Sequence, residues 1–187
     1  MNVPEKEEYV RALTRNFAAA LHIREPSVRF VKISASPNYD PLRNRIELGY
    51  AILTLPSLIV RVTIAHEVGH ATQRKALLLD LAADGLCKML IIAVPWIVYG
   101  WTARDKPWDI VISATAFVLA YGTYICTARA ARTKQAIALE VKADEIAAIL
   151  CGSHSTLRAL ETLSTFSLIR PERLEAFRAR LAQERST

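Results

Sequence analysis

Two long runs without a charged side chain constrain this sequence more than any other feature. They cover residues 89–103 and 110–128 and are 15 and 19 residues long. As α-helices they would be about 22 Å and about 28 Å long, and the hydrocarbon core of a bilayer is about 30 Å thick. Aromatic residues gather in and beside these runs, at Trp96, Tyr99, Trp101, Trp108, Tyr121 and Tyr124. We therefore expect a two-helix transmembrane hairpin over residues 86–128, with a buried helical hairpin in a soluble protein as the alternative.

The composition excludes several other classes. A chain of 187 residues suits one domain, and 52% hydrophobic residues exclude a disordered chain. The net charge is +6, but the Lys and Arg residues are spread along the chain rather than clustered among aromatics. Nucleic acid is therefore not expected as a partner, whereas anionic lipid is. Three cysteines, an odd number, argue against a disulfide framework, and the charged first ten residues argue against a signal peptide.

The patterning outside the apolar runs predicts an α+β fold that is mainly helical. Helical spacing covers residues 6–21, 57–79, 135–150, 155–168 and 171–183. Alternating residues predict strands over 28–33 and 45–50, separated by a turn-rich loop over 36–41. We expect one domain over 1–187, into which the hairpin is inserted, and a C-terminal helical cap over 155–187 that only packs.

The chemistry is concentrated in His66-Glu67-Val68-Gly69-His70, which lies inside the predicted helix over 57–79. Two histidines at positions i and i+4 share one helix face, so both imidazoles can bind one zinc ion. Glu67 is rotated about 100° from His66, which lets its carboxylate reach a zinc-bound water as a general base. Gly69, which is unfavourable in a helix, indicates that another backbone or the substrate approaches closely here.

A catalytic zinc site needs a third protein ligand and one open position. The candidates downstream are Asp80, Asp84, Glu140, Asp144, Glu145 and His154. Glu140 and Asp144 stand out because they lie at i and i+4 on a predicted helix. One carboxylate can then bind the metal while the other accepts a hydrogen bond from a ligand imidazole. By itself, such an acidic pair is more often a solvated helix face.

Two zinc peptidase groups resemble these segments. HEVGH with a downstream Glu140-x-x-x-Asp144 resembles the gluzincin metallopeptidases, in particular the integral-membrane HtpX and CAAX prenyl protease group. Residues 38–41, 46–48 and 66–73 are also similar to the YugP-type neutral zinc metallopeptidases, which are membrane proteins too. Together the similarities cover about residues 28–75 and 135–165. They imply that His66, His70 and Glu140 bind zinc, that Glu67 is the general base and that Asp144 supports the site.

These observations predict a membrane-associated zinc metalloendopeptidase. The alternatives are a membrane-associated zinc-binding or interaction protein without turnover, and a soluble zinc peptidase. We expect an extended peptide substrate to add to an exposed edge strand at residues 45–49, which places Ile46 and Leu48 at the substrate.

The charges beside the apolar runs predict the topology. Six cations flank the ends that face the rest of the chain, at Arg74, Lys75, Lys88, Arg129, Arg132 and Lys134. The turn over 104–109 carries only Arg104 and Lys106. Because Lys and Arg favour the cytoplasmic side, we expect the active site to face the cytoplasm.

Overall fold

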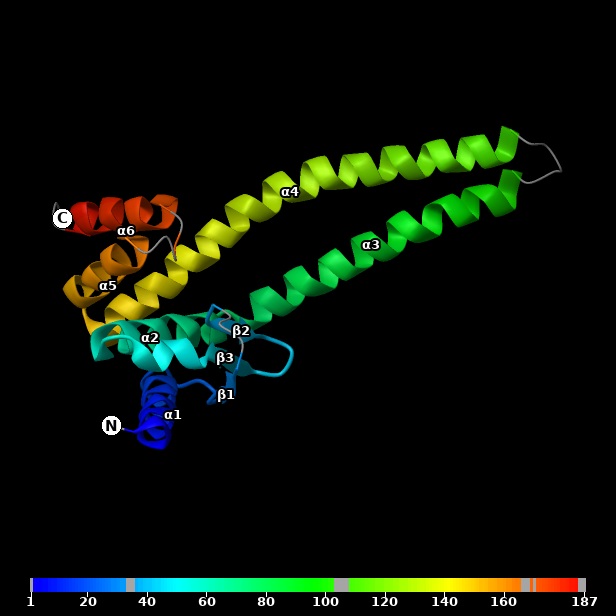
Figure 1. Ribbon diagram of the computed structural model, residues 1–187. Helices are drawn as coiled ribbons and strands as arrows, with labels where there is room; N and C mark the ends of the chain where they lie inside the picture. Colours follow the sequence, from blue (N-terminus) through cyan, green and yellow to red (C-terminus); the bar gives the residue numbers. More distant parts are fainter. Residues whose placement is uncertain (1, 33–35, 103–107, 166–168, 170, 185–187) are drawn as a thin grey trace. The chain divides into compact units, whose positions relative to one another are not determined.

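The computed structural model describes residues 2–32, 36–102, 108–165, 169 and 171–184, and it is mainly helical with one small sheet (Figure 1). The predicted α+β class is therefore confirmed. The chain forms two compact units. One combines Met1–Lys75 with Ile137–Thr187, and the other is Ala76–Ala136. The predicted turn over residues 104–109 lies largely outside the described residues.

The first unit begins with helix α1 (Val3–Ala20), which starts where the sequence caps it. The Asn2 side chain accepts a hydrogen bond from the Glu5 N–H, and the Glu5 carboxylate accepts one from the Asn2 N–H. This reciprocal pair satisfies backbone donors that a helix end leaves free. Val10 and Phe17 are buried, and α1 packs on helix α2 (Ser57–Thr72).

The sheet has three strands in the order β1-β3-β2, where β1 is Ser27–Val31, β2 is Asn38–Asp40 and β3 is Arg45–Gly49. Strand β3 pairs in parallel with β1 and antiparallel with β2. The expectation that β3 is an exposed edge is therefore wrong. It failed because the loop predicted over 36–41 contains the short strand β2.

Side chains of β3 alternate between a core face and a polar face. Ile46 and Leu48 are fully buried in the core, so the assignment of both residues to the substrate is wrong as well. On the polar face Arg45 forms ion pairs with Asp40 and Glu47. The alternation of side chains along the strand predicted which residues share a face. It does not indicate which strand lies at the edge of the sheet.

Helix α2 follows a short 3-10 helix (Tyr50–Thr54) and ends at Gln73, where the next helix α3 (Arg74–Thr102) begins. The predicted single helix over 57–79 is thus two helices. Helix α2 contacts α1, β2 and helix α5 (Ser153–Thr165), which explains why ten of its 16 residues are buried.

Three helical segments complete this unit: the last part of α4 (Trp108–Cys151), α5 and α6 (Pro171–Glu184). Gly152 has φ of +88° between α4 and α5, a conformation that glycine adopts without strain. Leu160 of α5 packs with Leu174 and Phe177 of α6. The helix predicted over 171–183 is confirmed within one residue.

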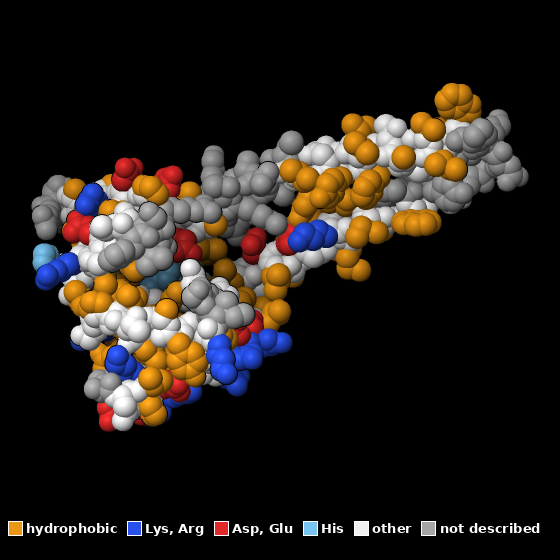
Figure 2. All heavy atoms as spheres, in the orientation of Figure 1, with side chains coloured by type: hydrophobic (Ala, Val, Ile, Leu, Met, Phe, Trp, Pro, Cys, Tyr) orange, Lys and Arg blue, Asp and Glu red, His pale blue; other side chains and the backbone are white. Residues whose placement is uncertain are grey.

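The second unit contains the rest of α3 and the first part of α4, which run side by side (Figure 1). Tyr124 of α4 donates a hydrogen bond to Asp84 of α3, and Lys88 pairs with Asp84 at 2.8 Å. Large apolar side chains are exposed along both helices (Figure 2). Within the described residues, however, no helix is both long enough and apolar enough to span a membrane. The two helices of the predicted hairpin are present, and its transmembrane character is not supported.

Candidate metal centre

The histidines of the HEVGH segment face a common point on α2. Their Nε2 atoms are 3.1 Å apart, and the His66 and His70 side chains are only 8% and 12% exposed. This is the arrangement that the i, i+4 spacing predicted. It places two metal-binding nitrogens together in a largely buried position.

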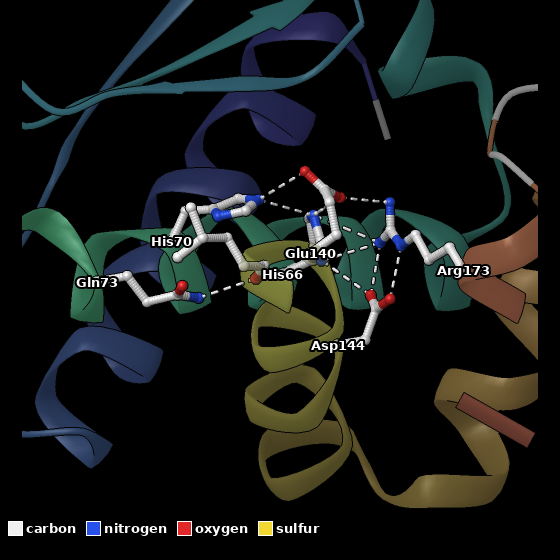
Figure 3. A network of polar contacts seen from close by, with 7 residues as sticks. His66, His70, Gln73, Glu140, Asp144 and Arg173 are labelled. Atoms are coloured by element: carbon white, nitrogen blue, oxygen red, sulfur yellow. Dashed lines mark hydrogen bonds and ion pairs between the residues drawn. The ribbon is translucent and has the colours of Figure 1, made fainter. Parts of the chain in front are cut away.

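Glu140 of α4 supplies the third potential ligand (Figure 3). Its Oε2 lies 3.3 Å from His66 Nε2, and its Oε1 lies 3.4 Å from His70 Nε2. A tetrahedral zinc ion with bonds of about 2.05 Å holds its ligand atoms about 3.3 Å apart. The contacts to the two histidines come from different Glu140 oxygens. With one ligand atom taken from each residue, all three atoms lie within 4.8 Å of one another, which is close enough to hold one metal ion. Of the six candidates that the sequence left open, Glu140 is the one that completes a His-His-carboxylate group among the described residues.

Asp144, one turn beyond Glu140, holds His66 from the other side. His66 Nδ1 lies 2.9 Å from Asp144 Oδ1, and the Asp144 carboxylate is 1% exposed. Since a carboxylate can only accept, Nδ1 carries the proton and the lone pair of neutral His66 lies on Nε2. Asp144 thus fixes the orientation of the His66 imidazole, and this contact is the hydrogen bond that the sequence analysis expected one of the two α4 carboxylates to accept.

A close helix crossing brings α4 to this point. A Cβ atom on Gly69 would lie 2.9 Å from the Ala143 carbonyl oxygen and 3.0 Å from its Cα. Any side chain at residue 69 would therefore push α4 away. This contact explains the glycine inside the HEVGH segment, which the sequence analysis linked to a close backbone.

Glu67 follows His66 on α2 and is buried, and it interacts electrostatically with His66, His70 and Glu140. The residue is 4% exposed, and its Oε2 has no hydrogen-bond partner among the described residues. Burial raises the pKa of this carboxyl, and the nearby His66 and His70 only partly oppose the shift. An unpartnered buried carboxylate is costly, which indicates that a ligand or water completes its hydrogen bonding. A group of this kind can accept and return a proton at a neighbouring reacting atom.

Arg173 of α6 is a site residue that the sequence analysis missed. Its guanidinium binds both carboxylate oxygens of Asp144, and its Nη1 lies 3.0 Å from Glu140 Oε2 (Figure 3). The helix predicted over 171–183 was assigned to packing alone. A signal was present, because Arg173 precedes Phe177 by one helical turn and so lies beside the apolar face of α6.

These charges shift the pKa values of the site in opposite directions. Burial and Arg173 lower the pKa of His66, but the contacts with Asp144, Glu140 and Glu67 outweigh them and raise it to about 9. For Glu140, an acid, burial raises the pKa. Its contacts with His66 and His70 outweigh burial and hold the pKa of Glu140 well below its ordinary value. Without a metal, the site is therefore an ionic cluster in which His66 is protonated.

The remaining candidate ligands are engaged or positioned elsewhere. Glu145 pairs with Arg180 of α6, and His154 is exposed. Asp84 pairs with Lys88 within the second unit, to which Asp80 also belongs.

Comparisons of the chain with protein families, with curated proteins and with solved structures find no match. The functional argument therefore depends on the geometry of the site.

Proposed function

We propose that the protein is a zinc-dependent peptidase whose metal is held by His66, His70 and Glu140. The observation that carries this proposal is the grouping of His66, His70 and Glu140, whose potential ligand atoms lie within 4.8 Å of one another, together with the buried Glu67 Oε2 that has no partner among the described residues. A purely structural zinc site would be closed by a fourth protein ligand and would need no adjacent base. Among the described residues the group has three potential ligands rather than four, and Glu67 is available as a base. Both features favour a catalytic over a structural zinc site.

Each residue of the site has a separate role in the proposed reaction. A zinc ion at this site would supply a Lewis acid for the scissile carbonyl and acidify a water molecule. Glu67 accepts the proton of the attacking water and later delivers it to the leaving amine. Asp144 keeps the His66 Nδ1–H in place, and Arg173 neutralises the two carboxylates of α4.

The substrate is proposed to be an extended peptide that adds to the free edge of β2 rather than to β3. Strand β2 contacts α2, and it pairs only with β3 among the described strands. A strand added there would be held by its backbone, with weak dependence on sequence. Peptides N-methylated at single positions test this, because the loss of one backbone donor should raise the KM at alternate positions only.

The decisive experiment for catalysis compares the wild type with Glu67→Gln in metal content and peptide hydrolysis. The amide cannot accept the water proton, so zinc should stay bound while hydrolysis falls by about 10²- to 10⁴-fold. His66→Ala, His70→Ala and Glu140→Ala should each lose zinc. Full hydrolysis by Glu67→Gln would disprove the mechanism. Zinc binding without hydrolysis in the wild type would favour a non-catalytic zinc protein.

We also propose that the α3–α4 pair contacts lipid, at the cytoplasmic face of a membrane. Exposed side chains at Ile110, Val111 and Ile112, and again at Phe117, Val118 and Leu119, are consecutive in α4. Consecutive residues are rotated by about 100°, so each trio covers most of the helix circumference. One docked protein covers one face, whereas lipid solvates every face of α4 that α3 leaves open.

Vesicle flotation tests the lipid contact. Val118→Asp and Leu42→Asp form a matched pair, since both side chains are 65% exposed and Leu42 lies in the first unit. We expect the wild type and Leu42→Asp to float with phosphatidylcholine vesicles that contain phosphatidylserine, and Val118→Asp to float less. Equal flotation of the two variants, or none by the wild type, would refute the lipid contact.

A further inference from the structure

Helices α2 and α4 touch at two places that are one turn apart on each helix. Gly69 meets Ala143, and Gln73 meets Leu139 through a hydrogen bond from its Nε2 to the Leu139 carbonyl at 3.1 Å. His70 lies between the two contact points on α2, and Glu140 lies between them on α4. The two contacts therefore flank His70 and Glu140, one proposed ligand from each helix.

The side-chain amide of Gln73 is buried and only partly hydrogen-bonded, which is energetically unfavourable. It is 5% exposed, and its Oε1 has no hydrogen-bond partner among the described residues. A methionine or leucine would fill similar space without burying an unsatisfied acceptor. What the amide adds over those residues is the single hydrogen bond to Leu139 (Figure 3).

That bond acts on the peptide unit that carries Glu140. The Leu139 carbonyl and the Glu140 nitrogen belong to one planar peptide group, so holding the carbonyl fixes the backbone from which Glu140 extends. The Glu140 side chain is 40% exposed and long, and packing alone restrains it little. Its carboxylate is held at the histidines by polar contacts and by the placement of its backbone.

We propose that Gln73 is the positioning residue for Glu140, through the Leu139 carbonyl. The inference rests on the proposed metal site, because it assigns Gln73 a role in holding the third ligand. The hydrogen bond of the Gln73 side chain is made to a backbone carbonyl and not to a proposed ligand. Its contribution is to fix the register of α4 on α2 at the turn that carries the ligand.

The test is a double-mutant cycle on zinc affinity, measured by competition with a chromogenic chelator. Gln73→Met keeps the side-chain length and removes the donor. In the native background it should weaken zinc binding by about fivefold to tenfold, the equivalent of one hydrogen bond. In the Glu140→Gln background, where the residual affinity comes from His66 and His70, Gln73→Met should change the affinity less than twofold.

Thr14→Val is the matched control. It removes another buried hydrogen bond from a side chain to a carbonyl, Thr14 Oγ1 to Val10 at 3.0 Å, in a helix that carries no ligand. Its zinc affinity should equal that of the wild type, although its thermal stability falls. An unchanged affinity in Gln73→Met, or an equal loss in both backgrounds, would overturn the role of Gln73 while leaving the metal site intact. A wild type that binds no zinc would instead overturn the proposed function, and this inference with it.

Discussion

The Asp144 carboxylate accepts a hydrogen bond from His66 Nδ1 at 2.9 Å, although 78 residues separate the two in the chain. The bond settles which nitrogen of neutral His66 faces His70 and Glu140. Asp144 holds Arg173 with the same carboxylate. One buried acid thus links the HEVGH helix, the helix of the third ligand and the last helix.

Asp144→Asn should weaken zinc binding by about 10- to 100-fold, the usual effect of losing the partner of a ligand histidine. The amide no longer fixes the Nδ1–H of His66 by charge, and Arg173 loses its strongest partner. Chelator competition measures the change. Glu161→Gln, which disrupts only the exposed pair with Arg178, should leave the zinc affinity unchanged. Equal affinities in both variants would contradict this role of Asp144.

Gly69→Ala should destabilise the protein by about 1–3 kcal/mol and weaken zinc binding. The added Cβ cannot fit 2.9 Å from the Ala143 carbonyl, so α4 must move and carry Glu140 with it. Gly85→Ala in α3 is the control, because a Cβ there meets nothing within 4 Å. In that open helical position alanine should stabilise by up to about 1 kcal/mol. Thermal melts with and without zinc compare the pair, and tight zinc binding by Gly69→Ala would show that the crossing is not needed.

Arg173→Gln should destabilise the metal-free protein by about 1.5–3 kcal/mol, since buried Asp144 keeps protonated His66 but loses the guanidinium that binds both of its oxygens. Zinc supplies positive charge to the same cluster, so the loss should be smaller in the zinc-loaded protein. By linkage, the variant should then bind zinc more tightly than the wild type. Arg178→Gln, on the same helix, removes only an exposed pair and should change stability by less than about 1 kcal/mol. Weaker zinc binding by Arg173→Gln would mean that Arg173 aligns the ligands rather than balancing their charge.

Zinc affinity should rise with pH by about tenfold per unit and level off near the His66 pKa of about 9. Below that pH the metal must displace the His66 proton. The metal-free protein should show the opposite trend, because the pKa of His66 is raised on folding. The stabilisation from protonated His66 is complete below its ordinary pKa of 6.5 and is lost as pH rises to about 9. Unfolding and chelator titrations between pH 6 and 8.5 test both slopes, and a zinc affinity independent of pH would be inconsistent with a protonated His66.

The parts of the site that depend on local spacing could be predicted from the sequence. His66 and His70 share a face because the helix has 3.6 residues per turn, and Glu140 and Asp144 follow the same rule on α4. Their meeting across the fold was a hypothesis drawn from the chemistry of zinc ligands. The geometry of the His66, His70 and Glu140 group agrees with it.

The parts that depend on tertiary contacts could not be predicted. Strand β2 is three residues long and carries no pattern of its own, so it exists only because β3 pairs with it. Arg173 reaches the site from a helix whose periodicity describes its packing face. Helix α2 ends at the C-cap residue Gln73, where no proline or glycine indicates the end of the helix in the sequence.

The hydrogen bond between Gln73 and Leu139 joins positions 66 residues apart, so the intervening chain leaves the first unit and returns to nearly the same point. A metal ion shared by His70 and Glu140 would act as a clip that closes this loop. The entropy lost on closing a flexible loop grows only with the logarithm of its length, about 0.6 kcal/mol for each doubling. In the unfolded chain, the length of the α3–α4 segment therefore adds little to the entropy lost when the site closes.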